Sequence, residues 1–383
     1  MNYSVIAISR IPHLNIYEGL CEIIRTCTEL PANVVLVCPH IEEEHSMELI
    51  SFGVKIHPVS TSGLSTKLPM SLNLLATVLR LHYSCKTSLF MGCDGMGNII
   101  ASLAARITST PYLHYSLELP PEREKYLPFR QKLELWSFRQ ADLLVTMDQP
   151  HADFICSETG IPPERIALAP NTLRGPGRRQ PSVSLKNHLG LKPDSILILH
   201  AGGIGAAQAS RQLAEAARSW DSDWQLVFHA HCDMRHEEYY RNFAQLLVNE
   251  PSIHLNAQSV PPEKLDDLVS NADIGLAWYD RDLLGFRADL LGLAAGKIGR
   301  YLRNGIPVVV KNLPTISAYI EQYSCGICVD RAEQIGPAIA TILSDHSKYS
   351  ENALRCYEEV WRPDQHLFDI RKRLQNLLSG AYR

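Results

Sequence analysis

Short apolar runs alternate with longer amphipathic segments along the whole chain. In the first half the apolar runs lie at residues 3–9, 33–39, 54–60, 88–93, 111–118 and 141–148. Amphipathic stretches separate several of them, for example residues 16–29 and 128–139. This alternation is typical of a parallel sheet that helices cover on both faces. The pattern therefore predicts an α/β fold with a doubly wound parallel sheet.

The pattern breaks at "RGPGRRQPSVSLK", residues 174–186, and then restarts. The glycine, proline, serine and arginine content of this stretch is typical of an exposed linker. Beyond it the apolar runs lie at residues 195–201, 224–231, 252–258, 273–279, 308–310 and 325–330. We therefore expect two Rossmann-like domains, residues 1–175 and 187–356, and a helical, basic last segment, residues 357–383.

Ligands of doubly wound sheets bind beyond the carboxyl ends of the strands. In a chain with two such sheets, the two edges would face each other across a cleft. This arrangement suits a reaction in which one half holds an activated donor and the other half holds the acceptor.

Composition excludes some classes of function. The 383 residues are 45% hydrophobic and 20% charged, which indicates a soluble globular protein. The net charge of −4 argues against general nucleic-acid binding. The ten cysteines are scattered, and Cys325 and Cys328 in "CGIC" have no partnering Cys or His cluster. We therefore expect reduced thiols in a cytosolic protein and no metal site.

The N-terminus lacks the basic and long apolar regions of a signal peptide, and no uncharged apolar run reaches about 18 residues. Peripheral contact with a membrane stays open. The segment "EKYLPFRQKLELWSFRQ", residues 124–140, mixes basic and aromatic side chains. Such a segment suits a lipid-linked acceptor at a membrane surface, and it equally suits an ordinary helix packed on a sheet.

The segment "HAGGIG", His200 to Gly205, places a glycine turn after a predicted strand. Glycine N–H groups in such a turn can approach a phosphate at the start of the next helix. The spacing is not that of GxGxxG, and no P-loop lysine follows. A simple tight turn explains the segment equally well.

The segment "GKIGRYLRNGIPVVV", residues 296–310, predicts a helix that runs into a buried strand. If the helix starts near Gly296, Lys297 lies in its first turn, where a cation is unfavourable unless an anion joins it. Arg300 lies one turn further on, so both side chains can point the same way. A bound diphosphate explains the pair, and a solvated helix face is the alternative.

Three residues of the first half are candidates for acid–base chemistry. Asp94 ends a strand at "GCDGMGN", although a capping role suits it as well. His114 and Glu118 in "HYSLELPPERE" are predicted to share one face of an extended segment. They would address an acceptor hydroxyl or cap the following helix. In the second half, residues 279–289 are expected to form a loop over the cleft, either functional or merely solvated.

Five segments occur in an order and spacing that carry a family resemblance. They are "ALAPNTL" (167–173), "LHAGGIGAAQASRQLAEAA" (199–217), "LVSNADIGLAWY" (268–279), "GKIGRYLRNGIPVVVKNLPTISAYIEQYSCGICVD" (296–330) and "VWRPDQHLFDIRKRLQNLL" (360–378). Together they resemble the GT-B glycosyltransferases, particularly the retaining group that includes glycosyltransferase family 4. The last segment resembles the helix that crosses back onto the first domain in this fold.

The resemblance implies a nucleoside diphosphate sugar, of UDP or GDP type, as the donor, and a hydroxyl acceptor held by the first half. It also implies no cofactor and no metal, because helix dipoles and basic side chains neutralise the leaving diphosphate. Lys297 matches the family's lysine in the phosphate-side motif, and Gly202 and Gly203 match its glycine turn. The expected donor site comprises Gly202, Gly203, Ile204, Tyr279, Lys297, Arg300, Ile316 and Ser317.

The sequence departs from the family pattern at three places. The family usually has a glutamate that contacts the donor ribose where this chain has Arg300, and a basic residue near Gln208. The glycine-rich loop of the N-terminal half is also missing, and Arg10 and His13 stand there instead. Because a guanidinium only donates hydrogen bonds, Arg300 cannot accept them from ribose, but it could neutralise the diphosphate. Alternatively, the chain is a catalytically silent subunit that stabilises a partner glycosyltransferase.

The expected chemistry is sugar transfer with electrostatic stabilisation of the departing diphosphate by the N–H groups of Gly203 and Ile204, by Lys297 and by Arg300. Retention at the anomeric carbon follows from the resemblance alone. Inversion would need a base in the first half, for which Asp94, His114 and Glu118 are the candidates. A sugar-nucleotide epimerase and a phosphorylase are rival activities, and a homo-oligomer stays open.

Overall fold

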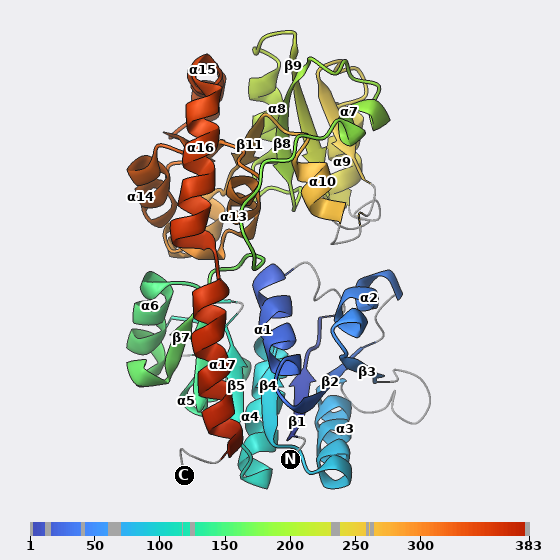
Figure 1. Cartoon of the computed structure of the whole chain (residues 1–383), viewed down its shortest axis with the longest axis vertical. Coiled ribbons are helices and arrows are strands. Elements are labelled where there is room, and N and C mark those ends of the chain that lie inside the picture. Colours follow the sequence, from blue (N-terminus) through green and yellow to red (C-terminus); the bar gives the residue numbers. More distant parts are fainter. Residues whose placement is uncertain are drawn as a thin grey trace. The chain divides into compact units, whose positions relative to one another are not determined.

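The computed structural model describes residues 3–11, 17–39, 43–59, 70–116, 118–122, 127–230, 238–257, 260 and 264–379. The chain forms two compact units (Figure 1). Unit 1 comprises Met1–Arg174 and Pro363–Arg383, and unit 2 comprises Gly175–Arg362. The chain therefore passes from unit 1 to unit 2 after Arg174 and returns after Arg362.

Unit 1 contains a seven-stranded parallel sheet in the order β3-β2-β1-β4-β5-β6-β7. Its strands are β1 (Tyr3–Ile8), β2 (Ala32–Cys38), β3 (Lys55–Pro58), β4 (Leu89–Gly92), β5 (Tyr112–Tyr115), β6 (Leu143–Thr146) and β7 (Ile166–Leu168). Its helices are α1 (Glu18–Thr28), α2 (Glu43–Ser51), α3 (Met70–Cys85), α4 (Gly95–Thr108), α5 (Phe129–Arg139), α6 (Gln149–Thr159) and α17 (Asp364–Ser379). The order reverses between β1 and β4, so their carboxyl ends mark the crevice of this sheet.

The C-terminal helix α17 belongs to unit 1, where it packs against α1 and β7 (Figure 1). Its apolar residues Leu367, Ile370 and Leu374 are buried. Arg373 donates to the carbonyl oxygen of Ile166 at 2.7 Å, which fixes the helix to β7. The apolar stripe at a spacing of three and four residues is therefore what attaches this helix.

Unit 2 contains a six-stranded parallel sheet in the order β10-β9-β8-β11-β12-β13. Its strands are β8 (Ile196–Ala201), β9 (Trp224–His229), β10 (Ile253–Asn256), β11 (Ile274–Ala277), β12 (Val308–Lys311) and β13 (Gly326–Val329). Its helices are α7 (Ser184–His188), α8 (Ser210–Ala217), α9 (Glu238–Leu246), α10 (Leu265–Val269), α11 (Arg281–Leu284), α12 (Phe286–Asp289), α13 (Gly296–Arg303), α14 (Pro314–Tyr323), α15 (Ile335–Ser344) and α16 (His346–Cys356). A π-helical turn, Tyr357–Trp361, continues α16. The strand order reverses between β8 and β11.

The central strands of both sheets are buried because helices cover both faces, as the unbroken apolar runs predicted, whereas the edge strand β3 is mostly exposed. All four residues of β4, β5, β6 and β11 are buried. The predicted α/β class with two Rossmann-like sheets is confirmed.

Candidate functional site

The glycine turn after β8 is fixed from two sides. Gly202 has a φ of 121°, a backbone conformation that favours glycine. Its N–H donates to the carbonyl oxygen of His229 at 2.8 Å, at the end of β9. On the other side His200 Nε2 lies 3.2 Å from the carbonyl oxygen of Gly203. The peptide groups of the turn therefore have a defined direction.

The next two N–H groups are available for a ligand. Within the part of the chain that the structure describes, neither Gly203 N–H nor Ile204 N–H has a hydrogen-bond partner. Residues 206–209 separate the glycine turn from helix α8, which begins at Ser210. An anion would thus bind to N–H groups of the turn itself.

Gln208 lies beside this turn, at the position where the family pattern has a basic residue. A Cβ atom on Gly203 would lie 3.4 Å from the Gln208 amide group. The side chain is therefore close enough to contact a ligand of the turn, but it is neutral. Any positive charge at this edge has to come from another element.

Lys297 is the cation that the structure brings to this edge. Helix α13 begins at Gly296, so Lys297 lies in the first turn, as the sequence predicted. Its Nζ is buried, lies 5.2 Å from the centroid of the Tyr279 ring, and has no hydrogen-bond partner among the described residues. Burial lowers the pKa of Lys297 to about 8 and raises the pKa of Tyr279. The site thus holds a cation without an anion, beside the positive end of a helix dipole.

The glycine turn and Lys297 belong to the same edge of the sheet. The turn follows β8, and Tyr279 comes two residues after β11, the neighbouring strand. These are the two strands between which the order of the sheet reverses. Such a switch point is where doubly wound sheets bind ligands.

Arg300, unlike Lys297, already has an anionic partner, Asp266. It is 4% exposed, and its Nη1 donates to Asp266 Oδ1 of α10 at 3.2 Å. Arg303 also forms an ion pair with Asp266, and Asn304 Nδ2 donates to Asp266 Oδ1 at 3.3 Å. Three groups of α13 and its C-terminus thus converge on one carboxylate. The predicted contact between Arg300 and a diphosphate stays a prediction, which would require this ion pair to open.

The two predicted residues on α14 are turned inward. Ile316 is 1% exposed and packs in the core. Ser317 Oγ accepts from the N–H of Leu313 at 3.1 Å and donates to Asn312 Oδ1 at 2.8 Å, which fixes the turn before α14. Thr315, which the sequence analysis missed, accepts from Gly292 N–H at 2.9 Å. These residues shape the segment after β12, and the buried Ile316 is not exposed to a ligand.

The loop over residues 279–289 is largely helical. It forms two short helices, α11 and α12, which the alternating charges of "YDRDLLGFRAD" did not reveal. Asp280 caps α11 by accepting from the N–H of Asp282 at 2.9 Å. Arg281 forms an ion pair with Asp289 at 2.6 Å across the two helices. The charges of this segment therefore stabilise its own fold.

In unit 1, Asp94 is the N-cap of α4, the alternative that the sequence left open. Its carboxylate accepts hydrogen bonds of 2.5–3.2 Å from the Ser9 hydroxyl and from the N–H groups of Arg10, Ile11, Met96 and Gly97. Because five donors occupy its two oxygens, the carboxylate holds the end of β1 against α4. His13, the other residue singled out near this loop, lies outside the described residues.

The prediction that His114 and Glu118 share one face is wrong. Strand β5 ends at Tyr115, His114 is 1% exposed, and Glu118 is exposed beyond the strand. The centroid of the His114 ring lies 4.0 Å from that of the Phe138 ring, and its Nδ1 lies 2.9 Å from the Tyr112 hydroxyl oxygen. Burial lowers the pKa of His114 to about 3. The residue is therefore a neutral core histidine at ordinary pH.

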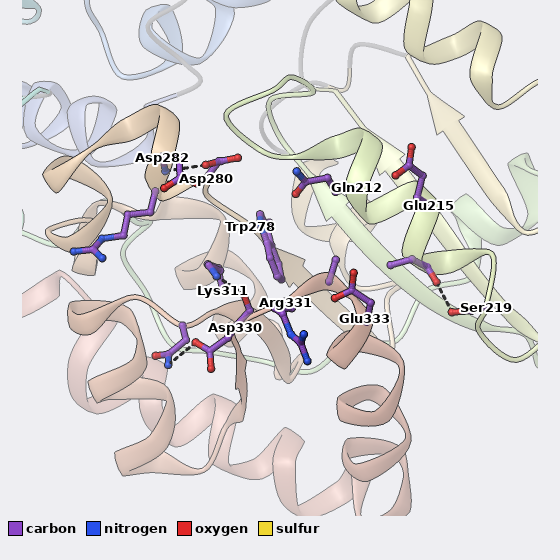
Figure 2. A pocket seen from close by; sticks show the side chains of 14 residues that line it. Gln212, Glu215, Ser219, Trp278, Asp280, Asp282, Lys311, Asp330, Arg331 and Glu333 are labelled. Carbon is purple, nitrogen blue, oxygen red and sulfur yellow. Dashed lines mark hydrogen bonds between the residues drawn. The ribbon is translucent and has the colours of Figure 1, made fainter.

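A groove of about 790 Å³ lies at the carboxyl ends of β11, β12 and β13, beside α8 (Figure 2). Trp278 lies among its lining side chains, with Lys311 Nζ 5.4 Å from the ring centroid. Lys311 also donates to the carbonyl oxygen of Asp330. The lining carboxylates are Glu215, Asp280, Asp282, Asp330 and Glu333, and the lining cations are Arg281, Lys311 and Arg331. This groove is unfavourable for a diphosphate, because carboxylates outnumber cations.

Three further features concern the described residues only. None of their helices is long and apolar enough to cross a membrane. No group of three or more His, Cys, Asp or Glu side chains among them is placed to hold a metal ion. The cysteines of this part of the chain, Cys325 and Cys328 among them, are free thiols.

Each unit contains a Rossmann-like parallel sheet, and comparisons with solved structures identify the fold of the chain. The chain matches the structure of HepE from Anabaena in complex with UDP-glucose, with a TM-score of 0.74, 13% identity, and coverage of 98% of this chain and 99% of the other. It matches sucrose-phosphate synthase from Thermosynechococcus elongatus with a TM-score of 0.73, 14% identity, and coverage of 99% and 100%. The chain therefore has the GT-B fold.

A family model matches part of the chain, and a further solved structure matches nearly all of it. Residues 215–361 match the family model described as "Glucosyltransferase 3-like, C-terminal domain". A UDP-GlcNAc 2-epimerase from Neisseria meningitidis bound to UDP-GlcNAc is also similar in structure, with a TM-score of 0.62, 15% identity, and coverage of 99% of this chain and 100% of the other. No curated protein matches the chain.

Proposed function

We propose that the protein is a glycosyltransferase that binds a nucleoside diphosphate sugar in unit 2 and transfers the sugar to a hydroxyl acceptor. One observation carries the proposal: the buried Lys297 amine has no hydrogen-bond partner among the described residues, at the edge that also presents the N–H groups of Gly203 and Ile204. A buried cation without a partner is costly. A diphosphate would supply the negative charge that Lys297 lacks, and its oxygens would accept hydrogen bonds from the N–H groups of the turn.

The comparisons support UDP as the first nucleotide to test. The similar HepE and epimerase structures hold UDP-glucose and UDP-GlcNAc, and the family model that matches most of unit 2 is described as glucosyltransferase-like. These ligands belong to those proteins. For this chain, UDP-glucose and UDP-GlcNAc are the first ligands to test, and GDP tests whether the site prefers guanine to uracil.

In the proposed reaction, the bond between the anomeric carbon and the diphosphate oxygen breaks, and the acceptor oxygen forms the new bond to that carbon. The acceptor proton leaves to solvent or to the departing diphosphate. Lys297 and the turn's N–H groups stabilise the charge that develops on the diphosphate, which requires neither a metal nor a resident cofactor. We further propose retention at the anomeric carbon, on the family resemblance alone. Asp94 and His114 are occupied in the fold of unit 1, which leaves the exposed Glu118 as the candidate base if the reaction inverts instead.

The test has two stages. The purified chain is screened by thermal shift against UDP, GDP, ADP and dTDP, with and without magnesium, because a ligand that binds only the folded state raises the melting temperature. The donor sugar of the preferred nucleotide is then incubated with the chain, and its hydrolysis or transfer is followed by NMR. Binding followed by release of the nucleoside diphosphate supports the proposal. Binding without turnover favours the silent subunit, and the absence of any binding overturns the proposal.

A sugar-nucleotide epimerase is the second candidate, because the groove beside Trp278 brings five carboxylates together and epimerases are among the similar structures. The same NMR experiment separates the two activities. An epimerase converts UDP-GlcNAc into its C2 epimer with no acceptor present, and this conversion does not require that UDP be released into solution. A transferase leaves that carbon unchanged.

A further inference from the structure

Strands β8 and β11 separate early, at the switch point of unit 2. In their register Ile198 pairs with Ile274 and Leu199 pairs with Gly275, and the pairing ends at these two residues. The next two residues of β8 lead into the glycine turn. Leu199 and Ala201 are buried, so their backbone groups on the β11 side need partners from another element.

The Tyr301 hydroxyl of α13 supplies both partners. It donates to the carbonyl oxygen of Leu199 at 2.7 Å and accepts from the N–H of Ala201 at 2.8 Å. A neighbouring parallel strand would make the same pair of bonds, to a carbonyl and to the N–H two residues later. One phenol oxygen thus takes the place of one residue of β11, whose pairing with β8 ends at Gly275.

Gly275 makes this contact possible. A Cβ atom on Gly275 would lie 2.5 Å from carbon atoms of the Tyr301 ring. The ring therefore lies directly on the backbone of β11, and any other residue at position 275 would displace it. Tyr301 is 0% exposed.

The bond to Ala201 fixes the backbone immediately before Gly202. The Gly202 N–H is held by His229 on the other side, so the turn is bound by β9 and by α13 together. Lys297 lies one turn earlier on the same helix α13. A single helix thus carries the candidate cation and sets the position of the N–H groups with which that cation would act.

We propose that Tyr301 is a positioning residue: its hydroxyl sets the geometry of the glycine turn relative to Lys297, so that one diphosphate contacts both. This inference rests on the proposed function. The Tyr301 hydroxyl does not touch the ligand. It acts through the Ala201 peptide group.

The variant Tyr301→Phe retains the ring on Gly275 and removes only the hydroxyl. Tyr357→Phe is the matched control, because Tyr357 is also buried and its hydroxyl donates to the carbonyl oxygen of Gly175 at 3.0 Å, away from the turn. Both variants are expected to lose stability. Tyr301→Phe leaves the Leu199 carbonyl and the Ala201 N–H without their hydroxyl partner, and Tyr357→Phe leaves the Gly175 carbonyl without its partner. Affinity for UDP is then measured by calorimetry well below both melting temperatures.

We expect Tyr301→Phe to raise the Kd of UDP at least fivefold and Tyr357→Phe to change it less than twofold. Amide hydrogen exchange of the segment from Leu199 to Gly205 should also become faster in Tyr301→Phe and stay unchanged in the control. A Kd within twofold of the wild type in Tyr301→Phe overturns the positioning role while the proposed function stands. If the wild type binds neither UDP nor another of the four nucleotides, the proposed function fails and this inference fails with it.

Discussion

The Lys297 amine lies 5.2 Å from the centroid of the Tyr279 ring and has no hydrogen-bond partner among the described residues. Lys311 makes a similar approach to the ring of Trp278, at 5.4 Å, but it also donates to a backbone carbonyl. Both amines therefore lie near an aromatic ring, but only the Lys311 amine has a hydrogen-bond acceptor among the described residues. The difference makes Lys297 the cation whose environment is incomplete without an anion.

The first prediction concerns stability at alkaline pH. Burial lowers the pKa of Lys297 to about 8, whereas the unfolded chain has the ordinary value of 10.5. Between these values the unfolded state binds more protons, so the contribution of Lys297 to the free energy of unfolding rises with pH. The slope approaches about 1.4 kcal/mol per pH unit. Urea titrations of the wild type and of Lys297→Met at pH 7 to 10 measure the difference.

In Lys297→Met this pH-dependent contribution should be absent. The variant should also be more stable than the wild type below pH 8, by about 1 kcal/mol, because an unpaired buried charge is replaced by an apolar side chain of similar shape. A parallel pH dependence of the two proteins would show that the Lys297 amine is solvated in the folded state.

The second prediction concerns Asp266, on which Arg300 and Arg303 converge. Asp266→Ala should destabilise the protein by about 2 kcal/mol, because the buried Arg300 guanidinium loses an ion-pair partner. Asp267→Ala is the control, since Asp267 is exposed and its carboxylate accepts only from the Ser184 hydroxyl, at 2.9 Å, in the hydrogen bonds described. Urea denaturation compares the two. An equal loss of unfolding free energy in the two variants would show that the ion pair between Asp266 and Arg300 does not stabilise the protein.

The third prediction concerns Asp94. Removal of a carboxylate that accepts five hydrogen bonds should cost about 3 kcal/mol, which exceeds the typical cost of losing an N-cap alone. Asp94→Ala should therefore lower the midpoint of urea denaturation strongly. Asp153→Ala, an exposed position on α6, should have little effect. A small loss in Asp94→Ala would indicate that the carboxylate is free for another role.

The sequence predicted the α/β class and the runs that became most of the strands, because parallel strands buried on both faces are apolar without interruption. It also placed Lys297 in the first helical turn and identified the glycine turn after β8. These features depend on local spacing alone. Their local character is why they were predictable.

The contacts between distant elements were not predictable from the sequence. The pairing of Arg300 with Asp266 joins residues 34 positions apart, and Tyr301 bonds Leu199 across 102 positions. Nothing in the spacing of either helix indicates these partners. The burial of His114 was missed for a different reason: a period of two places a residue on a face of a strand, but it does not say whether a helix covers that face.

The fourth prediction tests the central claim most directly, by calorimetric titration of UDP into the wild type, Lys297→Met and Lys311→Met at pH 7.5. We predict that Lys297→Met raises the Kd about 10- to 100-fold, the loss expected for a charged hydrogen bond to a diphosphate. Lys311→Met should remain within twofold of the wild type. If Lys297→Met binds UDP as tightly as the wild type, or if Lys311→Met is the variant that loses binding, the diphosphate does not bind at the edge assigned to it.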